Sequence, residues 1–223
     1  MEICPTYNKV QLINQLHINV KNMYRRFIKP AFDFVVALIA IIVLIPILIL
    51  VAIAIKLNSK GSVFFLQERL GKNGRVFKIF KFRSMRTDIV TYKFGEVLTE
   101  NNPQITYTGK FIRKTSIDEI PQLINILKGD MSFIGPRPPV TFYPKKYEDY
   151  TDFEKQRFSV KPGISGLAAV RQREINDWSK NIPVDVEYVQ NISFLLDLKL
   201  FLVSLLAFFR TDNIYTKITQ KTR

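Results

Sequence analysis

Cysteine and histidine are nearly absent from this 223-residue sequence. The single cysteine, Cys4, excludes a disulfide bond within the chain and gives no sign of an oxidising compartment. The single histidine, His17, argues against histidine-based metal sites and Ser/His catalytic triads. Residues 1–22 also lack an apolar run, so they do not have the pattern of a cleaved signal peptide. We expect residues 1–24 to form an N-terminal extension with room for a short helix.

Acidic residues are scarce relative to basic ones. The chain has 33 Lys and Arg against 19 Asp and Glu, which gives a formal net charge of +14 at pH 7. An excess of this size suits a negatively charged partner, such as nucleic acid, an anionic membrane surface or a phosphorylated substrate. The chain is 47% hydrophobic, and its length suffices for one domain of about 150 residues with attached segments.

Charged residues are missing altogether between residues 34 and 55, and this run points to a membrane. As a helix it would be about 33 Å long, enough to cross the hydrocarbon core of a bilayer. Pro46 lies near its middle, where it removes a backbone hydrogen bond and kinks a helix. Basic residues flank the run on both sides, with Lys21, Arg25, Arg26 and Lys29 before it and Lys56, Lys60, Arg69, Lys72 and Arg75 after it.

Two topologies account for this segment. In a re-entrant hairpin the helix bends at Pro46 and returns to the same face, and each arm is about 15 Å long, or half of the hydrocarbon core. Both basic flanks then lie in the cytoplasm, as the positive-inside rule favours. In a kinked full span the proline is tolerated, as in other membrane helices. The residues alone leave both alternatives open.

A second apolar stretch, residues 194–210, contains charges. Asp197 and Lys199 interrupt it, and its uncharged run, residues 200–209, is too short to cross a membrane. The pattern fits a helix that lies in the membrane interface, or simply a helix of the protein core.

Residues 76–86, VFKIFKFRSMR, alternate apolar and basic side chains over much of their length, which predicts a β-strand. The basic members are Lys78, Lys81, Arg83 and Arg86. They would meet phosphates or lipid headgroups, or else form the solvated edge of a strand.

An acidic pair stands out in the stretch TSIDEIPQL, residues 115–123. Apolar residues recur at helical spacing after it and a glycine ends the run, so we expect a helix here. Ser116 and Glu119 have the spacing of a capping box. With Asp118 as the cap instead, Pro121 falls in the first turn, where its missing N–H costs little.

Asp118 and Glu119 are adjacent, so on a helix their side chains point in different directions and we expect separate roles for them. Arg113 and the lysine after it lie just upstream and could hold a phosphate. Prolines on either side of Arg137 fix its backbone, and a rigidly presented guanidinium suits phosphate recognition, although a proline-rich connector is the common alternative. The glycines of KPGISG, residues 161–166, predict a turn.

The order of these features resembles that of the bacterial sugar transferases, the small monotopic phosphoglycosyl transferases. It runs from an apolar helix broken by proline through KFRSMR, RKTSIDEIPQLINILKGDMSFIGPRP and KPGISGLA to DVEYVQNISFLLDLK. The likeness extends over about residues 25–210, and the stretch from the acidic pair to Pro-Arg-Pro is its most specific part.

The resemblance implies a reaction and a place. Members of this family move a sugar 1-phosphate from a UDP-sugar to a polyprenol phosphate with Mg²⁺, and release UMP. They work at the cytoplasmic face of the bacterial inner membrane, and their hydrophobic segment is a re-entrant helix, which favours the hairpin here. The implied partners are a UDP-sugar donor, a polyprenol phosphate acceptor such as undecaprenyl phosphate, and inner-membrane lipids, but no nucleic acid.

The same resemblance assigns site residues. Asp118 falls on the nucleophile of the family's motif and Glu119 on its acidic partner, so both are expected to be catalytic residues and Mg²⁺ ligands. The expected substrate-binding residues are Arg113, Pro136, Arg137, Pro138, Arg173 and Asp185, joined by Lys81 and Arg83 of the basic strand.

General chemistry agrees with this assignment. An aspartate can attack phosphorus and form an acyl phosphate, which divides one difficult transfer into two steps. Mg²⁺ prefers one or two carboxylates together with phosphate oxygens of the substrate. Arg113 and Arg137 can add to the neutralisation of a diphosphate.

Two departures from the family pattern concern the bend and the sugar. Ile45 precedes the bending proline where the family usually has serine, so no side-chain hydroxyl satisfies the carbonyl that Pro46 frees. The sequence GLAAVRQR, residues 166–173, stands where the family commonly has GLAQVNGR. Its Arg171 adds a positive charge that suits an unusual or acidic sugar.

We therefore predict a membrane-associated α+β fold that is mostly helical. Residues 25–60 form a re-entrant membrane helix, residues 61–210 a compact cytoplasmic catalytic domain with interfacial helices, and residues 211–223 a tail. The predicted function is phosphoglycosyl transfer that starts a lipid-linked glycan. A non-enzymatic membrane-anchored adaptor for anionic lipids would explain the charge and apolarity but not the acidic pair, and a nucleic-acid binder lacks a recognisable motif.

Overall fold

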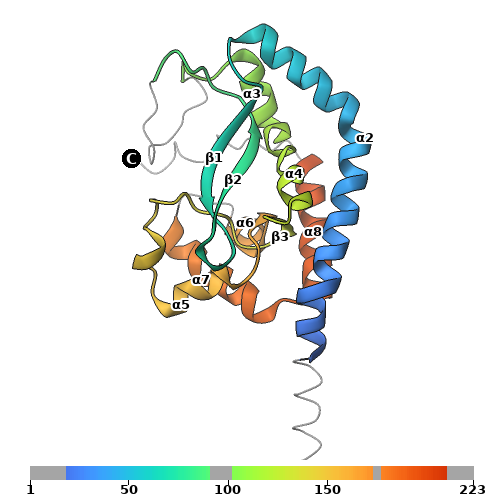
Figure 1. The fold of residues 1–223 in the computed structure, drawn as a ribbon, viewed down its shortest axis with the longest axis vertical. Coiled ribbons are helices and arrows are strands. Elements are labelled where there is room, and N and C mark those ends of the chain that lie inside the picture. The colour runs from blue at the N-terminus through green and yellow to red at the C-terminus, as the bar shows by residue number, and fades with distance from the viewer. Residues whose placement is uncertain (1–18, 91–101, 173–176, 210–223) are drawn as a thin grey trace, which may run out of the picture.

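The computed structural model describes residues 19–90, 102–172 and 177–209, and this part of the chain is mostly helical (Figure 1). Its helices are α2 (Lys29–Asn58), α3 (Tyr107–Lys114), α4 (Gln122–Leu127), α5 (Asp152–Lys155), α6 (Leu167–Gln172), α7 (Trp178–Asn191) and α8 (Phe194–Phe209). Its strands are β1 (Phe64–Leu70), β2 (Val76–Phe82), β3 (Ser132–Ile134) and β4 (Gly163–Ser165). Short 3-10 turns occupy Lys72–Gly74, Ile117–Glu119, Tyr147–Asp149 and Gln156–Ser159, and a π-helical turn occupies Tyr24–Ile28. The prediction of a mostly helical α+β fold is confirmed.

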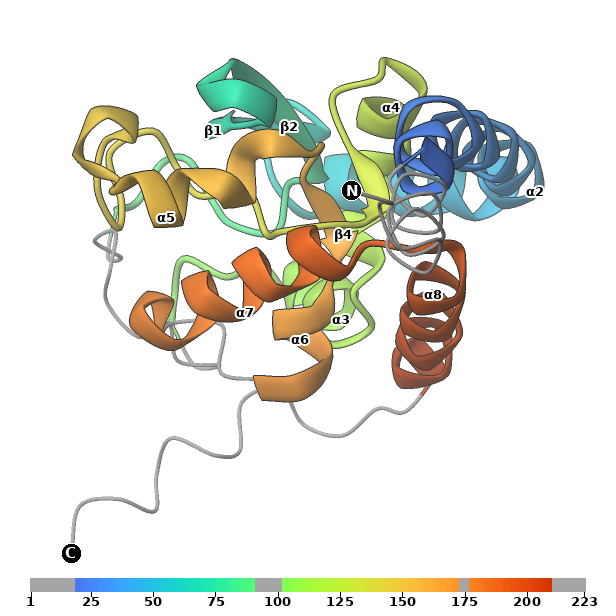
Figure 2. The ribbon, with the colours of Figure 1, turned by 90° about the horizontal axis from the view of Figure 1, so that it is seen from below.

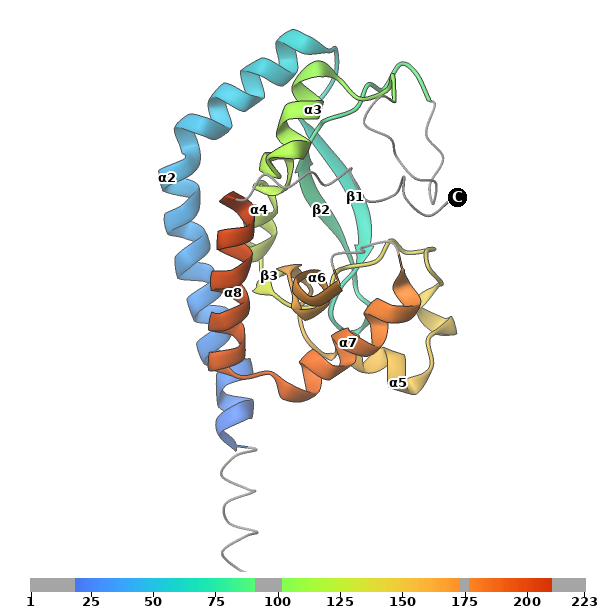
Figure 3. The same ribbon diagram turned by 180° about the vertical axis from the view of Figure 1, so that it is seen from behind.

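The longest element is α2, which continues the helical stretch before it, so that the helix runs from Asn19 to Asn58. By length and composition it can cross a membrane, and little of its most apolar part is buried against the rest of the described protein. Pro46 lies inside α2, and Figures 1 and 3 show the C-terminal part of the helix curving over the domain. Its exposed side chains include Val35, Ile39, Ile42, Val43 and Leu50. Apolar surface of this extent calls for a non-aqueous environment.

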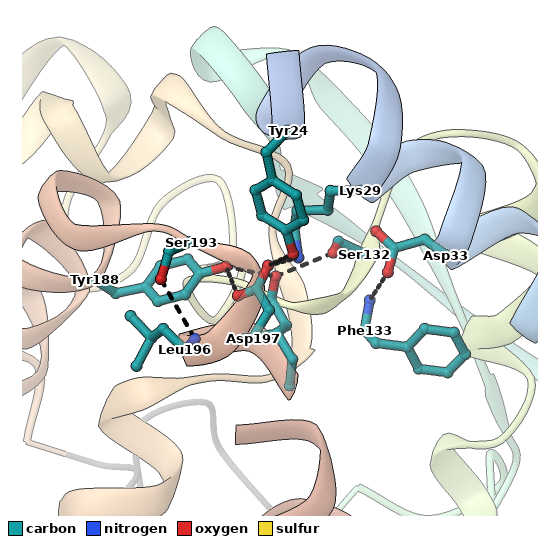
Figure 4. A network of polar contacts seen from close by, with 10 residues as sticks. Tyr24, Lys29, Asp33, Ser132, Phe133, Tyr188, Ser193, Leu196 and Asp197 are labelled. Atoms are coloured by element: carbon teal, nitrogen blue, oxygen red, sulfur yellow. Dashed lines mark hydrogen bonds and ion pairs between the residues drawn. The ribbon is translucent and has the colours of Figure 1, made fainter. Parts of the chain in front are cut away.

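The N-terminal end of α2 is fastened to the domain by a buried carboxylate on α8 (Figure 4). Asp197 accepts hydrogen bonds from the hydroxyls of Tyr24 at 2.6 Å and Tyr188 at 2.7 Å. The ammonium of Lys29 lies 2.7 Å from the same carboxylate, and both side chains of this ion pair are 9% exposed. One acidic residue thus joins the beginning of α2 to α7 and α8.

The C-terminal end of α2 is fastened by Arg83, which follows β2. The last carbonyl groups of a helix have no partner within the helix. The Arg83 guanidinium donates to the carbonyl of Lys60 at 2.7 Å and to that of Ser59 at 2.8 Å, and it is buried. Gly61 has a φ of +121°, and a Cβ there would collide with this guanidinium, so glycine is required for the close approach. Both ends of α2 are therefore held by buried polar contacts to the same folded domain.

Replacing Asp197 with alanine should strongly destabilise the protein. The change leaves Lys29 buried without its carboxylate, removes the acceptor of the Tyr24 hydroxyl, and leaves the Tyr188 hydroxyl with only the Ile134 carbonyl. Breaking a buried ion pair on one side costs about 3 kcal/mol or more, which urea unfolding in mild detergent can measure. Lys199→Ala on the exposed face of the same helix is the matched control and should change the free energy of unfolding by no more than about 0.5 kcal/mol. Equal stability of the two variants would contradict the role given to Asp197.

Between its ends, α2 packs against the hairpin and helix α4. Ala37 of α2 lies in one buried cluster with Phe77 and Ile79 of β2 and with Leu123 and Ile126 of α4. Strand β2 confirms the strand predicted from the alternation of apolar and basic residues. It pairs with β1 in an antiparallel hairpin.

Helix α4 is joined to the hairpin by a fully buried asparagine. The side chain of Asn125 donates to the carbonyl of Lys78 at 2.8 Å and accepts from the backbone N–H of Phe80 at 2.9 Å. It thereby satisfies backbone groups on the edge of β2, as a neighbouring strand would. Because α4 follows the acidic pair directly, this contact fixes the pair relative to the hairpin.

The second sheet corrects one prediction. The glycine-rich segment KPGISG was expected to be a turn, but its Gly163–Ser165 portion forms strand β4, which pairs in parallel with β3. A Cβ at Gly163 or Gly166 would collide with the backbone of Gly135. The glycines therefore serve close packing of two backbone segments rather than a change of direction.

Helix α8 confirms the helix expected over residues 194–210, and it lies beside α2 (Figures 1 and 2). Leu200 is buried, whereas Leu195, Leu202 and Leu206 are exposed. The helix therefore contributes to the core with one face and presents an apolar surface with another. Its location in the membrane interface remains a prediction.

Candidate active site

The acidic pair lies in a 3-10 turn, Ile117–Glu119, between helices α3 and α4. Neither of the two caps considered from the sequence forms. The Ser116 side chain makes no capping hydrogen bond, and its backbone has a φ of +55°, in the left-handed region. Pro121 rather than Asp118 occupies the N-cap position of α4, without a side-chain cap. The capping interpretation of Glu119 is therefore wrong, and both carboxylates are available for other contacts.

Lys81 of β2 reaches Glu119 directly. Its Nζ lies 2.5 Å from Glu119 Oε1, and both side chains are partly buried. Burial alone would raise the pKa of the Glu119 carboxyl. The charges of Lys81 and Arg137 outweigh that effect and hold the pKa of Glu119 at about 2. Glu119 is therefore ionised throughout the physiological range.

Asp118 has a different electrostatic environment. Burial, aided by the neighbouring charge of Glu119, raises the pKa of the Asp118 carboxyl to about 6, against the opposing charge of Lys81. Arg113 also acts on it and favours the ionised form. The two adjacent carboxylates thus differ: the pKa of Glu119 is lowered, whereas that of Asp118 is raised but still leaves it largely ionised at pH 7.

The Pro-Arg-Pro segment leaves strand β3 and passes close to the end of β1. The carbonyl of Pro138 accepts a hydrogen bond of 3.0 Å from Arg69, and that of Arg137 accepts one of 2.8 Å from Arg157. The backbone N–H of Leu70 donates to the carbonyl of Pro139 at 2.9 Å. These three contacts hold the backbone of the segment, while the half-buried Arg137 side chain makes no hydrogen bond within the described parts of the chain.

Asp185 of α7 forms a buried ion pair. Its Oδ2 lies 2.6 Å from the Arg157 guanidinium, and the two side chains are 2% and 1% exposed. Burial raises the pKa of the Asp185 carboxyl although Arg157 opposes the shift. Asp185 also lines a pocket that includes Arg137 and Gly163. Asp185, which was expected to bind substrate, is thus paired with Arg157, a residue that the sequence pattern did not single out.

The remaining predicted residues lie in different surroundings. Arg113, in the last turn of α3, donates to the Ser84 hydroxyl at 3.4 Å and acts on Asp118 by its charge. Arg83 is committed to the carbonyl groups at the end of α2. Arg173 lies outside the described residues.

The acidic pair can be tested for its fit to Mg²⁺. The described residues contain no group of three or more His, Cys, Asp or Glu that could hold a metal ion. Mg²⁺ usually takes one or two carboxylates and completes its shell with water and phosphate oxygens. Asp118 and Glu119 therefore fit a Mg²⁺ that is bound together with a phosphorylated substrate, and not a metal held by protein alone.

A family model and several curated proteins that match this chain all describe sugar transferases. The model of the family described as "Bacterial sugar transferase" matches residues 24–211. The chain is 44% identical over 156 residues to galactosyl transferase CpsE of Streptococcus agalactiae, which covers 65% of this chain and 34% of that protein. It is 36% identical over 185 residues to UDP-glucose:undecaprenyl-phosphate glucose-1-phosphate transferase of Escherichia coli, covering 78% of this chain and 39% of that protein.

A third relative is similar in length. The uncharacterized sugar transferase EpsL of Bacillus subtilis is 40% identical over 173 residues, covering 78% of this chain and 83% of that protein. By contrast, the matched region spans only 34% and 39% of the first two relatives. The similarity to those larger proteins concerns one part of each.

Proposed function

This chain belongs to the bacterial sugar transferase family, and we propose that it transfers a sugar 1-phosphate from a UDP-sugar to a membrane polyprenol phosphate. The product is a lipid-linked sugar that starts a glycan, and the by-product is UMP. The observation that carries the proposal is an acidic pair surrounded by cationic side chains. These are Lys81, Arg113 and Arg137, together with Arg69. The names of related proteins support a UDP-sugar donor and an undecaprenyl phosphate acceptor.

In the first step the Asp118 carboxylate attacks the β-phosphorus of the UDP-sugar. A bond forms between the carboxylate oxygen and phosphorus, and the bond from that phosphorus to the bridging oxygen breaks. UMP leaves with the bridging oxygen, and the sugar phosphate remains as an acyl phosphate on Asp118. The partly desolvated, ionised carboxylate described above suits this role because less water must be removed before attack.

In the second step a phosphate oxygen of the polyprenol phosphate attacks the same phosphorus. The acyl phosphate bond breaks, the carboxylate of Asp118 is restored, and a polyprenyl diphosphate sugar is formed. Lys81 and Arg113 stabilise the negative charge that builds up on the transferred group. Glu119 holds Lys81 in place through their 2.5 Å contact.

Asp118 and Glu119 would also hold Mg²⁺ with the donor's phosphates. A bound Mg²⁺ supplies charge neutralisation and orientation of the phosphoryl group. The side chain of Arg137 is uncommitted in the described residues, which supports a contact of this residue with the nucleotide. A membrane-anchored adaptor would need none of this convergence of carboxylates and guanidinium groups.

We further infer that α2 is re-entrant and that the domain lies on the cytoplasmic face of the inner membrane. The buried contacts of Lys29 and Arg83 support this, because both ends of α2 meet the same domain. A straight helix from Lys29 to Ile55 would be about 39 Å long and would separate these contacts by a full bilayer. The basic flanks support the cytoplasmic face.

Intact mass spectrometry tests the proposed mechanism. Purified protein incubated with Mg²⁺ and a UDP-sugar, without any lipid acceptor, should gain the mass of one sugar phosphate and release one equivalent of UMP. Adding polyprenol phosphate should remove the adduct. Full activity with lipid but no adduct at any time would favour direct transfer. No UMP release from a panel of UDP-sugars would overturn the proposed function itself.

A further inference from the structure

Arg69 lies on the same face of the β1–β2 hairpin as Lys81. The register pairs Phe65 with Lys81 and Arg69 with Phe77. Directly paired residues share a face, and residues two or four apart along a strand share it as well. Lys81 contacts Glu119 from this face. Arg69 therefore lies on the face of the hairpin that is directed toward the acidic pair.

The contacts of Arg69 link this face to the Pro-Arg-Pro segment. Its Nη1 donates to the carbonyl of Pro138 at 3.0 Å, and its Nη2 donates to the side-chain oxygen of Gln67 at 2.6 Å. Arg69 and Val140 also form an isolated β-bridge. The guanidinium is held by these contacts within electrostatic range of both Arg137 and Glu119.

The guanidinium of Arg69 is not satisfied by these contacts. An arginine has five N–H donors, and the buried Nε of Arg69 has no hydrogen-bond partner among the residues that the structure describes. No carboxylate forms an ion pair with Arg69 in this part of the chain. Buried donors normally find an acceptor, and the described residues supply none for this Nε, so we expect a bound ligand to supply it.

Charge points to the kind of ligand. Burial and the nearby Arg137 lower the pKa of Arg69 to about 10, while Glu119 opposes the shift. Two guanidinium groups held close together repel each other unless an anion lies between them. Around the acidic pair four cationic side chains face two carboxylates, which leaves an excess of two positive charges for a bound anion.

We propose that Arg69 binds the diphosphate of the nucleotide donor together with Arg137, and that it holds the Pro-Arg-Pro segment beside the acidic pair. The inference rests on the proposed function, since a nucleoside diphosphate sugar is the anion in question. The planar fork of arginine suits two phosphate oxygens at once, which a lysine cannot reproduce. Gln67 orients this fork.

Equilibrium binding of UDP and of uridine, with Mg²⁺ present, tests the assignment on the full chain in detergent. Arg69→Gln should raise the dissociation constant of UDP at least tenfold and change that of uridine less than twofold. Arg69→Lys should give a smaller loss for UDP, about threefold, because a point charge remains. Arg75→Gln removes an exposed arginine from the same hairpin and should bind UDP as the unaltered protein does.

The comparison separates the alternatives. If UDP and uridine binding fall in parallel in Arg69→Gln, the residue only maintains the loop and the proposal is wrong. It is also wrong if Arg69→Gln matches Arg75→Gln while the unaltered protein binds UDP and releases UMP. If the unaltered protein neither binds UDP nor releases UMP from UDP-sugars, the proposed function fails and the inference fails with it.

Discussion

Replacing Asp118 with asparagine should reduce UMP release from a UDP-sugar by about a thousandfold or more, the scale seen when a nucleophile is removed from an enzyme. An amide cannot form the acyl phosphate, so the first of the two steps is lost. UMP release and the mass of the intact protein after incubation with the donor measure the effect. The variant should show no adduct.

The loss must come from chemistry and not from unfolding. Asp118 makes no hydrogen bond to another described side chain, so its replacement by an isosteric amide should leave thermal unfolding within a few degrees of the original. Glu119→Gln is the informative comparison. It removes the partner of Lys81 and should lower activity, but it should not weaken α4, because Glu119 does not cap that helix. Near-normal UMP release by Asp118→Asn would refute the nucleophile assignment.

The second large effect concerns the reaction of introduced cysteines with an impermeant thiol reagent. We expect no reaction on intact cells and full reaction once the membrane is opened. Single cysteines introduced for Asn22 and Lys60, in a Cys4→Ser background, lie at exposed positions on the two sides of the apolar segment. Both should resist an impermeant thiol reagent on intact cells and react once the membrane is opened. The reason is that Asp197 and Arg83 hold both ends of α2 on one domain.

A control and a decisive alternative accompany this experiment. Arg75→Cys at the hairpin turn reports the side on which the domain lies and should behave like the other two. Labelling of Asn22→Cys alone on intact cells would establish a full span. Adding Pro46→Ala to each cysteine variant then asks whether the proline or the two end contacts determine the topology.

Local patterns predicted the elements of this protein well. The alternation of apolar and basic residues gave β2, and the apolar stretch with two charges gave α8. Arg113, expected beside the acidic pair, does act on Asp118, whereas Lys81, expected to meet phosphates or lipid headgroups, forms an ion pair with Glu119. The two elements follow from residues that are near one another in the chain.

Pairs that are distant in sequence could not be predicted in the same way. The sequence identifies Arg69 only as part of a basic flank, and it gives no signal for Arg157. Asp197 appeared as an interruption of an apolar run, although it holds a lysine 168 residues away. The local sequence around these residues does not predict their partners, because the contacts depend on how the hairpin and the helices pack. A buried charge inside an apolar stretch was the one available signal.

Tertiary contacts also determine the backbone at two places where the local sequence predicts a turn or a helix cap. The glycines at positions 163 and 166 have the composition of a turn, yet they form and follow a strand because the backbone of Gly135 lies against them. Similarly, the spacing of Ser116 and Glu119 satisfies the rule for a capping box, but Ser116 adopts a left-handed backbone conformation and Glu119 turns to Lys81. Spacing alone does not distinguish a cap from a site.

Lys81 and Arg83 are two positions apart on one stretch of backbone, one bound to the acidic pair and the other to the end of the membrane helix. Two residues of extended chain measure about 7 Å. With the proposed topology and mechanism, we expect this short stretch to fix the height of the acidic pair above the lipid surface. We would then expect a lipid acceptor to raise only its headgroup to that level while its hydrocarbon tail stays in the bilayer, and donors with larger sugars to extend on the aqueous side.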